Sequence, residues 1–298
     1  MYKIVSKATS ANLGPGFDCM GICLSLSNTM TFDEYDGAIV VNNHADTVRN
    51  RSNLIVSSFY KTAEIIGYEP KGLRLNVKTS VPLSRGLGSS ATCICAGVTG
   101  AYLLSGQQFT NEDIFEISAM IEGHPDNVSP NIFGGMTLSY TRTDGKYSHV
   151  KFDVDPKYRF VAMIPDFKLS TEKSRQVLPQ EYSRKDAVFN VARNSMLIEA
   201  LRSGNNELLR EALHDRIHQP YRKSLIKNYD EITGILFSGG AIGTYLSGAG
   251  PTIMGIVDSE SAFRSIASEL RNSPYANSWN CEMYEIDNEG MKYMQMNE

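Results

Sequence analysis

The sequence contains 298 residues, of which 42% are hydrophobic, so it is long enough for two ordinary domains with a hydrophobic core in each. Its 29 basic and 33 acidic residues give a net charge of −4, which argues against nucleic acid or another polyanion as a partner. No apolar run approaches the roughly 20 residues of a membrane span, and the N-terminal residues lack the apolar core of a signal peptide, so we expect a cytoplasmic protein without a membrane partner.

The first half of the chain mixes strand-like and helix-like segments. Alternating apolar and polar residues indicate strands, and longer apolar patterns with a period of roughly 3.6 residues indicate helices. We expect strands at residues 2–8, 22–32, 71–81 and 132–140, and helices at residues 53–67, 89–104 and 111–121.

The second half begins with a new apolar strand at residues 159–164. A polar, turn-rich stretch at residues 141–149 and Pro156 precede this strand, which predicts a domain boundary there. Beyond it we expect helices at residues 185–202, 206–214, 224–236 and 261–272, and strands at residues 242–246, 252–257 and 279–286. The sequence therefore predicts an α+β protein with domains at residues 1–156 and 157–298.

The cysteines predict free thiols. The chain has five of them, Cys19, Cys23, Cys93, Cys95 and Cys281, and most lie among small apolar residues. Cys93 and Cys95 are separated by one residue, which is poor spacing for zinc ligands. We therefore expect buried thiols and neither a metal site nor disulfides.

A glycine-rich segment at residues 82–92, PLSRGLGSSAT, separates a predicted strand from a predicted helix. Gly86 and Gly88 allow close backbone approach and positive φ, and the free N–H groups at a helix start attract anions. The alternative is a simple glycine-rich turn capped by serine. No lysine follows the second glycine, which argues against the GxxxxGK[ST] nucleotide loop. The predicted phosphate cradle consists of Pro82, Leu83, Ser84, Arg85, Gly86, Leu87, Gly88, Ser89, Ser90, Ala91 and Thr92.

A second polar cluster occurs in IEGHPDNVSPNIFGG, residues 121–135. Glu122, His124, Asp126 and Asn127 crowd at the end of a predicted helix, where polar side chains converge on a loop. This density predicts a binding site. The alternative is an Asp-Asn turn with a histidine at the helix terminus.

Two further glycine-rich segments lie at residues 8–21 and 246–255. Together with residues 82–92, and in this order, they resemble the three signature motifs of the GHMP small-molecule kinases. EGHPDN at residues 122–127, followed by IFGG, is similar to the homoserine kinases within that family. The matched motifs span residues 5–255, so the resemblance covers most of the chain.

The resemblance implies the two-domain GHMP kinase fold. Its N-terminal nucleotide-binding domain is like domain 2 of ribosomal protein S5, and its C-terminal domain is ferredoxin-like. It implies an enzyme that uses ATP and Mg²⁺ to phosphorylate the side-chain hydroxyl of L-homoserine, a step of threonine biosynthesis, and a homodimer. The alternatives are another GHMP kinase, of the mevalonate-pathway type, and a non-catalytic metabolite sensor with this fold.

Homoserine carries a carboxylate and an ammonium, so its pocket needs a cationic fork and oxygen acceptors. Residues 169–179 and 215–222 resemble the stretches that bring arginines to the carboxylate in this family, which implies Arg175 and Arg222 as the clamp. The other substrate-binding candidates, which accept from the ammonium or shape the pocket, are Asn12, Asp18, His124, Asp126, Asn127 and Gly248.

By analogy with the family, Ser90 and a helix glutamate hold Mg²⁺, which prefers hard oxygen ligands. Glu122 adjoins the matched motif, and Glu116 is the alternative; six positions along a helix rotate by about 240°, so both cannot face one ion. Asp18 is the candidate general base. The alternative is catalysis without a dedicated base, since Asn127, an amide, stands where mevalonate kinases have an aspartate. The catalytic candidates are therefore Asp18, Ser90 and Glu122.

Four other residues have subsidiary predicted roles. Gly248 and Gly250 are expected to abut the phosphate cradle. Thr171 is a candidate phosphate contact, and Asn53 either reaches the adenine or caps the first helix.

Overall fold

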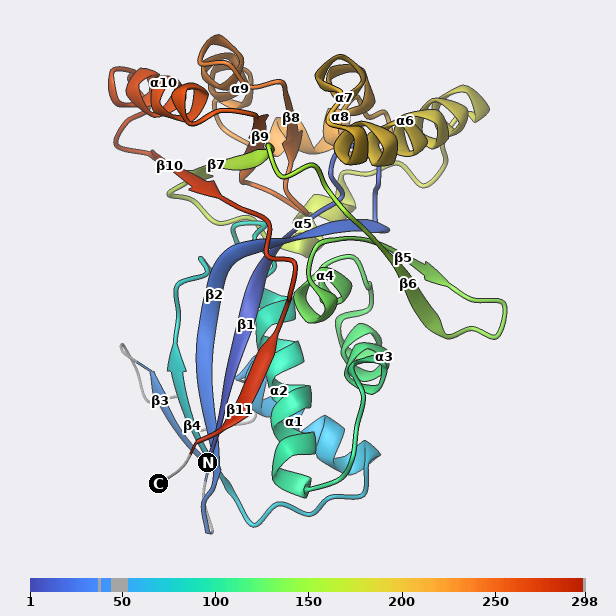
Figure 1. Ribbon diagram of the computed structural model, residues 1–298, viewed down its shortest axis with the longest axis vertical. Coiled ribbons are helices and arrows are strands. Elements are labelled where there is room, and N and C mark those ends of the chain that lie inside the picture. Colours follow the sequence, from blue (N-terminus) through green and yellow to red (C-terminus); the bar gives the residue numbers. More distant parts are fainter. Residues whose placement is uncertain (37–38, 44–52, 297–298) are drawn as a thin grey trace.

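Two β-sheets organise the chain, one above the other in the view of Figure 1. The structure is a computed structural model that describes residues 1–36, 39–43 and 53–296. Helices pack on both sheets, so helices and strands are mixed as the predicted α+β class requires.

The lower sheet has the strand order β11-β1-β2-β4-β3, and β5 pairs with β2 and β6. All of its pairs are antiparallel except β3 with β4. Its strands are β1 (Tyr2–Ala11), β2 (Met20–Glu34), β3 (Ile39–Asn43), β4 (Leu73–Lys78), β5 (Met136–Thr141), β6 (Tyr147–Phe152) and β11 (Lys292–Gln295).

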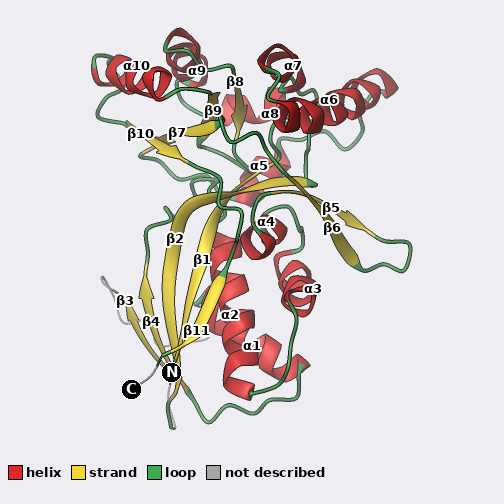
Figure 2. Ribbon diagram, in the orientation of Figure 1, coloured by secondary structure: helices red, strands yellow, loops and turns green. Residues whose placement is uncertain are grey.

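Helices cover one face of the lower sheet, as Figure 2 shows. They are α1 (Leu54–Ile65), α2 (Ser89–Ser105), α3 (Asn111–Glu122) and α4 (Val128–Phe133). The small apolar residues of α2 let it lie in the middle of this layer: a Cβ at Gly97 would come 2.5 Å from the Ile55 carbonyl oxygen. The Asn53 side chain accepts from the Ile55 N–H at 3.0 Å and caps α1, which confirms the capping alternative.

The upper sheet is antiparallel with the order β10-β7-β9-β8. Its strands are β7 (Arg159–Pro165), β8 (Gly243–Leu246), β9 (Ile253–Val257) and β10 (Trp279–Tyr284). Helices fill the connections from β7 to β8 and from β9 to β10, so the order matches the split βαβ topology of ferredoxin-like folds, as expected. The helices are α5 (Thr171–Gln176), α6 (Arg184–Ser203), α7 (Asn206–Ala212), α8 (Gln219–Arg222), α9 (Tyr229–Ser238) and α10 (Glu260–Arg271), and a 3₁₀ turn spans Lys223–Leu225.

Both faces of the upper sheet are buried. Alternate residues of β7 point to opposite faces: Val161 packs under α9 and α10, whereas Phe160 packs toward β1 and β2 of the lower sheet. A continuous apolar core therefore joins the two sheets.

The C-terminal segment returns to the lower sheet. Ile286 forms an isolated bridge with Leu24, and β11 then pairs with β1. The domain boundary between residues 156 and 157 stays a prediction. A single boundary does not account for β11, which follows the upper sheet in sequence but pairs in the lower sheet.

Two predicted elements are wrong in part. The strand expected at residues 132–140 begins only at Met136, because Ile132 and Phe133 end α4 and two glycines with positive φ follow them. The helix expected at residues 224–236 begins at Tyr229. The elements that were not predicted are β3, β6, β11, α5 and α8. These are short, and periodicity is weakest in short segments.

All five cysteines are free, as predicted, but only Cys23 and Cys95 are buried, whereas Cys19, Cys93 and Cys281 are partly exposed. Within the described ranges, none of the helices has both the length and the apolar character that crossing a membrane would take.

Candidate active site

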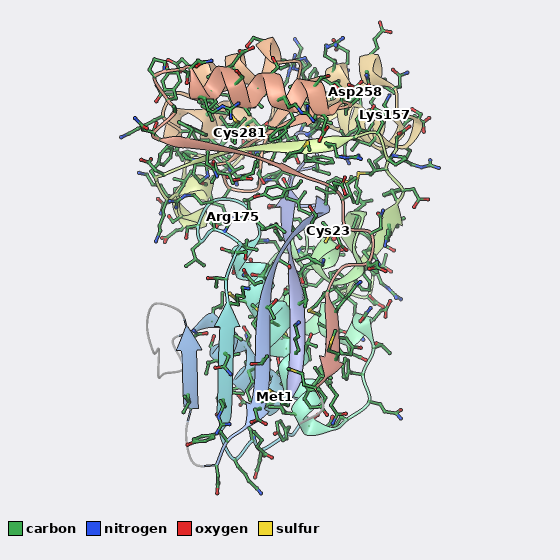
Figure 3. All side chains as sticks on the ribbon, turned by 60° about the vertical axis from the view of Figure 1, so that its left-hand side comes forward. Met1, Cys23, Lys157, Arg175, Asp258 and Cys281 are labelled. Carbon is green, nitrogen blue, oxygen red and sulfur yellow. The ribbon has the colours of Figure 1, made fainter. Side chains whose placement is uncertain are left out.

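A cavity of about 250 Å³ lies where the two sheets meet, and every predicted substrate-binding residue lines it. Figure 3 shows Arg175 at this level, between the upper and lower parts of the molecule. The predicted residues that line the cavity are Asn12, Asp18, Ser84, Gly86, Gly88, Ser89, Ser90, Glu122, His124, Asp126, Asn127, Thr171, Arg175, Arg222, Gly248 and Gly250.

The N-terminus of α2 opens onto this cavity without a cap. Gly88 stands at the N-cap position with φ +67°, and among the described residues the helix start has no side-chain cap hydrogen bond. Ser89 and Ser90 line the cavity at this point. An uncapped helix start presents free N–H groups and a partial positive charge, which suits a phosphate.

Gly88 also satisfies a packing requirement. A Cβ there would come 2.0 Å from the Thr9 hydroxyl oxygen and 3.2 Å from the Asn127 Oδ1. The Thr9 hydroxyl itself donates to the Asn127 Oδ1 at 2.7 Å. Thr9 was not among the predicted site residues, although it lies in the first glycine-rich segment.

Other residues of the predicted cradle have structural contacts. Leu87 and Ala91 are buried in the apolar cores. Arg85 lies outside the cavity lining: its Nε donates to the Pro165 carbonyl at 2.8 Å and its Nη2 to the Asp166 carbonyl at 2.5 Å. Arg85 therefore ties the loop to the upper sheet. The others outside the lining are Pro82, Leu83 and Thr92.

The three glycine-rich segments contact one another through hydrogen bonds to main-chain carbonyls. The Ser247 hydroxyl donates to the Gly86 carbonyl at 2.6 Å, and the Asn12 Nδ2 donates to the Gly248 carbonyl at 2.8 Å. A Cβ at Gly86 would come 2.4 Å from the Ser247 carbonyl oxygen. The expected contact between the third segment and the cradle is confirmed.

Ser90 and Glu122 lie side by side: the Ser90 hydroxyl donates to the Glu122 Oε2 at 2.7 Å. Burial raises the pKa of Glu122, and the hydrogen bond from Ser90 opposes that shift. Glu116 lies elsewhere, exposed, with its carboxylate 3.6 Å from the Lys146 Nζ. Of the two glutamates, the structure therefore places Glu122 in the cavity.

This pair fits Mg²⁺ by the chemistry of its donors, because a hydroxyl and a carboxylate are hard oxygen ligands. Across the ranges that the structure covers, no group of three or more His, Cys, Asp or Glu side chains is arranged to hold a metal ion by itself.

His124 pairs with Asp126 across the cavity wall, with 2.8 Å between Nδ1 and Oδ1. Burial opposes protonation of His124, but the hydrogen bond and charge of Asp126 and the charge of Glu122 outweigh it and raise the pKa of the imidazole. The Asp126 Oδ1 also accepts from the Asn127 N–H at 3.0 Å.

Asp18 and Arg175 bind each other. The two guanidinium nitrogens of Arg175 donate to the two carboxylate oxygens of Asp18, each at 2.9 Å. Asn12 orients Asp18, because its Oδ1 accepts from the Asp18 N–H at 3.0 Å. The two residues assigned to opposite ends of the substrate thus pair directly, and both are more than a third exposed, at 36% and 39%.

Arg222 is buried, at 2% exposure, and yet lines the cavity. Its Nε donates to the Ser174 carbonyl at 3.2 Å and its Nη1 to the Gly248 carbonyl at 3.0 Å. It forms no ion pair with a carboxylate in the part of the chain that is described. Burial lowers its pKa to about 10, so it remains charged at neutral pH. The charges of Asp18, Asp126 and Asp215 act on Arg222 from a distance, but a buried cation that contacts no carboxylate directly favours an anionic ligand.

Comparison with known proteins gives the same family. Models of the GHMP kinase N-terminal and C-terminal domains match residues 53–135 and 197–277. The chain is 39% identical to a homoserine kinase of Caldicellulosiruptor bescii over 295 residues, 97% of this chain and 96% of that protein. It is 43% identical to a homoserine kinase of Clostridium beijerinckii over 259 residues, 87% of each.

A solved structure of a homoserine kinase has the same fold as this chain. The crystal structure of the homoserine kinase from Cytophaga hutchinsonii aligns with a TM-score of 0.85 at 24% identity, over 98% of this chain and 96% of that one. The expected two-domain fold is confirmed. By sequence and by fold, the chain belongs to the homoserine kinases of the GHMP kinase family.

Proposed function

We propose that the protein transfers the γ-phosphoryl group of ATP to the side-chain hydroxyl of L-homoserine, giving O-phospho-L-homoserine and ADP. The observation that carries this proposal is the pairing of two anion-binding features on one cavity. The uncapped N-terminus of α2 suits a phosphate, and buried Arg222 suits a carboxylate.

Residues 82–92 would hold the triphosphate through the N–H groups at the start of α2. The close approach of backbone at Gly86 and Gly88 leaves no room for side chains there. Thr171, at the start of α5 on the same cavity, is a candidate phosphate contact.

Ser90 and Glu122 would hold Mg²⁺ through their oxygens. When bound, the ion would neutralise phosphate charge during transfer. The hydrogen bond between Ser90 and Glu122 keeps both oxygens on the cavity wall at the start of α2.

For the amino acid, Arg175 and Arg222 would bind the carboxylate, and oxygen atoms around Asp18 would accept from the ammonium. The other residues that would surround the amino acid are Asn12, His124, Asp126, Asn127 and Gly248. Asp18 is also the candidate general base, since Asn127 cannot accept a proton at its amide nitrogen.

We also infer a cytoplasmic homodimer. Relatives that act on a small metabolite support the compartment, and Val188 and Val191, which are 62% and 69% exposed on α6, are compatible with a subunit contact. Light scattering tests the dimer, and the mass of a single chain in solution would contradict it.

The activity is tested by measuring ADP release from Mg²⁺-ATP in separate reactions with L-homoserine, L-serine, L-threonine, mevalonate and galactose. We expect turnover with homoserine, and phosphorus NMR of the product should show a phosphate ester. Turnover of mevalonate but not homoserine would indicate a mevalonate-type kinase. No turnover with any acceptor would favour a non-catalytic sensor.

A further inference from the structure

We propose that His218 is a positioning residue that holds Arg222 ready for the substrate carboxylate. This inference rests on the proposed function, because it concerns the carboxylate end of the same pocket. His218 lies outside the cavity lining, and although it stands within residues 215–222, it was not among the predicted site residues.

His218 is fully buried and uses both ring nitrogens. Its Nε2 lies 2.8 Å from the Gly14 carbonyl oxygen, which can only accept, so the proton is on Nε2. Its Nδ1 is then a free acceptor, 3.3 Å from the Arg222 Nη1. The imidazole thus links the backbone of the first glycine-rich segment to the guanidinium.

Phe17 completes the support of the guanidinium. Its ring stacks on the imidazole of His218 with 5.2 Å between centroids. The Arg222 guanidinium lies over the same ring at 5.0 Å from its centroid, and that of Arg175 lies at 5.9 Å. Both arginines of the predicted clamp and His218 therefore pack on the same aromatic ring.

Asp215 fixes the backbone that carries His218. Its carboxylate, with no exposed surface, accepts from the N–H groups of Ile217, His218 and Gln219 at 2.9, 2.9 and 2.7 Å. It also accepts from the Asn190 Nδ2 at 2.6 Å. Its Oδ2 is 3.7 Å from the His218 Nε2, so the Nε2 proton goes to Gly14 instead.

The charge state of His218 agrees with this role. Burial lowers its pKa to about 4, and the nearby positive charge of Arg222 acts in the same direction, whereas Asp215, the Gly14 carbonyl and Asp18 oppose the shift. At neutral pH the ring is therefore uncharged. Protonation would replace the acceptor at Nδ1 with an N–H that faces Arg222.

Three substitutions of His218 test separately its hydrogen bonds to Gly14 and to Arg222. His218→Asn keeps an acceptor near the position of Nδ1, His218→Gln keeps a donor near Nε2, and His218→Phe keeps only the ring that stacks on Phe17. Exposed His214, four residues earlier in the connection between α7 and α8, provides the matched control His214→Asn.

We expect His218→Phe and His218→Gln to raise the KM for homoserine on the order of tenfold, because Arg222 loses an acceptor. The kcat and the KM for ATP should change less than about twofold, since the α2 end of the cavity is untouched. His218→Asn should restore most of the homoserine KM, and His214→Asn should equal the wild type. Thermal unfolding of each variant shows whether it folds.

An unchanged homoserine KM in His218→Phe would overturn the proposal, as would equal losses in His218→Asn and His218→Gln. Parallel rises in both KM values with lower thermal stability would also overturn it, because they indicate a purely structural role. If His218→Phe fails to fold, the comparison of Asn with Gln decides. A wild type that does not phosphorylate homoserine overturns the proposed function and this inference together, whereas an active wild type with unaffected variants overturns only the inference.

Discussion

At the scale of single residues, Arg222 is held by backbone carbonyls and an imidazole, and no acidic side chain pairs with it among the described residues. A bound carboxylate would therefore form a direct ion pair with Arg222 without breaking an existing one. Arg175 differs, because its guanidinium is already paired with Asp18.

Arg222→Leu should raise the KM for homoserine by the equivalent of about 2–4 kcal/mol, because the substrate carboxylate loses a charged partner in a buried site. The KM for ATP should change little. Steady-state kinetics check this, with Arg216→Leu as control, since Arg216 forms a half-exposed ion pair with Asp186 at 3.3 Å. A higher KM for ATP with an unchanged homoserine KM would reverse the assignment of the two ends of the cavity.

Ser90→Ala should lower kcat and raise the Mg²⁺ concentration needed for half-maximal activity, each roughly 10- to 100-fold. The reason is that the substitution removes one hard oxygen and leaves Glu122 without the hydrogen bond that orients it. Mg²⁺ titrations of the rate provide the measurement. Ser105→Ala, at the other end of α2, is the control, and equal behaviour of the two variants would remove Ser90 from the metal site.

Sequence motifs predicted the residues that face the cavity better than the residues behind them. Glu122, His124 and Asp126 are neighbours in the chain, so a single motif identified them together. Thr9 and His218 act through contacts with residues more than a hundred positions away, which one sequence does not reveal. The one local signal was the four-residue spacing of His218 and Arg222; in the structure His218 is the N-cap of α8 and Arg222 is its last residue.

At the scale of elements, the start of α2 depends on a glycine and not on a capping side chain. The two ends of this helix offer a matched pair of substitutions. Gly88 and Gly106 both have positive φ, +67° and +70°, but only Gly88 has atoms crowded against its Cβ position.

Gly106→Ala should cost about 1 kcal/mol in the free energy of unfolding, from the backbone conformation alone. Gly88→Ala should cost more, about 3 kcal/mol, because the added methyl would meet the Thr9 hydroxyl at 2.0 Å. It should also weaken ATP binding. Urea unfolding and nucleotide titration measure both effects, and equal losses of stability would show that the contact with Thr9 relaxes freely.

Element prediction succeeded where the apolar pattern was long. β2 and α6 were both recognised, whereas β3 and β11 are only five and four residues long and left no clear period. α4 was mistaken for the start of a strand because its apolar residues are followed directly by Gly134 and Gly135. A short apolar run next to glycines fits either structure.

At the scale of the whole molecule, a partly buried ion pair holds the C-terminal segment against the lower sheet. The Lys7 Nζ lies 2.5 Å from the Asp287 Oδ2, and the two side chains are 13% and 16% exposed. Burial opposes ionisation of Asp287, but hydrogen bonds from Lys7 and from the N–H groups of Gly290 and Glu289 outweigh it and lower its pKa.

Asp287→Ala should lower the free energy of unfolding by about 2 kcal/mol at pH 7, because Lys7 is left partly buried without its carboxylate partner. A carboxyl whose pKa is lowered in the folded state stabilises above its unfolded-state pKa, and that contribution is lost as the pH falls through the folded value. The difference from wild type should therefore shrink in acid. Urea unfolding between pH 7 and pH 3 measures it, with the exposed pair variant Glu289→Ala as control.

A difference that stayed constant down to pH 3 would show that the ionised carboxylate of Asp287 is not the source of its stabilisation.

The two-domain fold was predictable from three glycine-rich motifs that span most of the chain. The return of β11 to the first sheet was not, because its residues, KYMQ, are few and exposed and pair with β1 from nearly three hundred positions away.

Asp18 and Arg175 already satisfy one another, so an incoming molecule competes with a bond that exists before it arrives. A zwitterion would offer a new partner to both residues at once. Its ammonium would pair with the Asp18 carboxylate, and its own carboxylate would pair with the Arg175 guanidinium. A simple amine or a simple acid would pair with only one of the two residues and would leave the charge of the other unpaired. If the proposed roles of Asp18 and Arg175 hold, we expect the protein to discriminate against small metabolites that carry only one of the two charges.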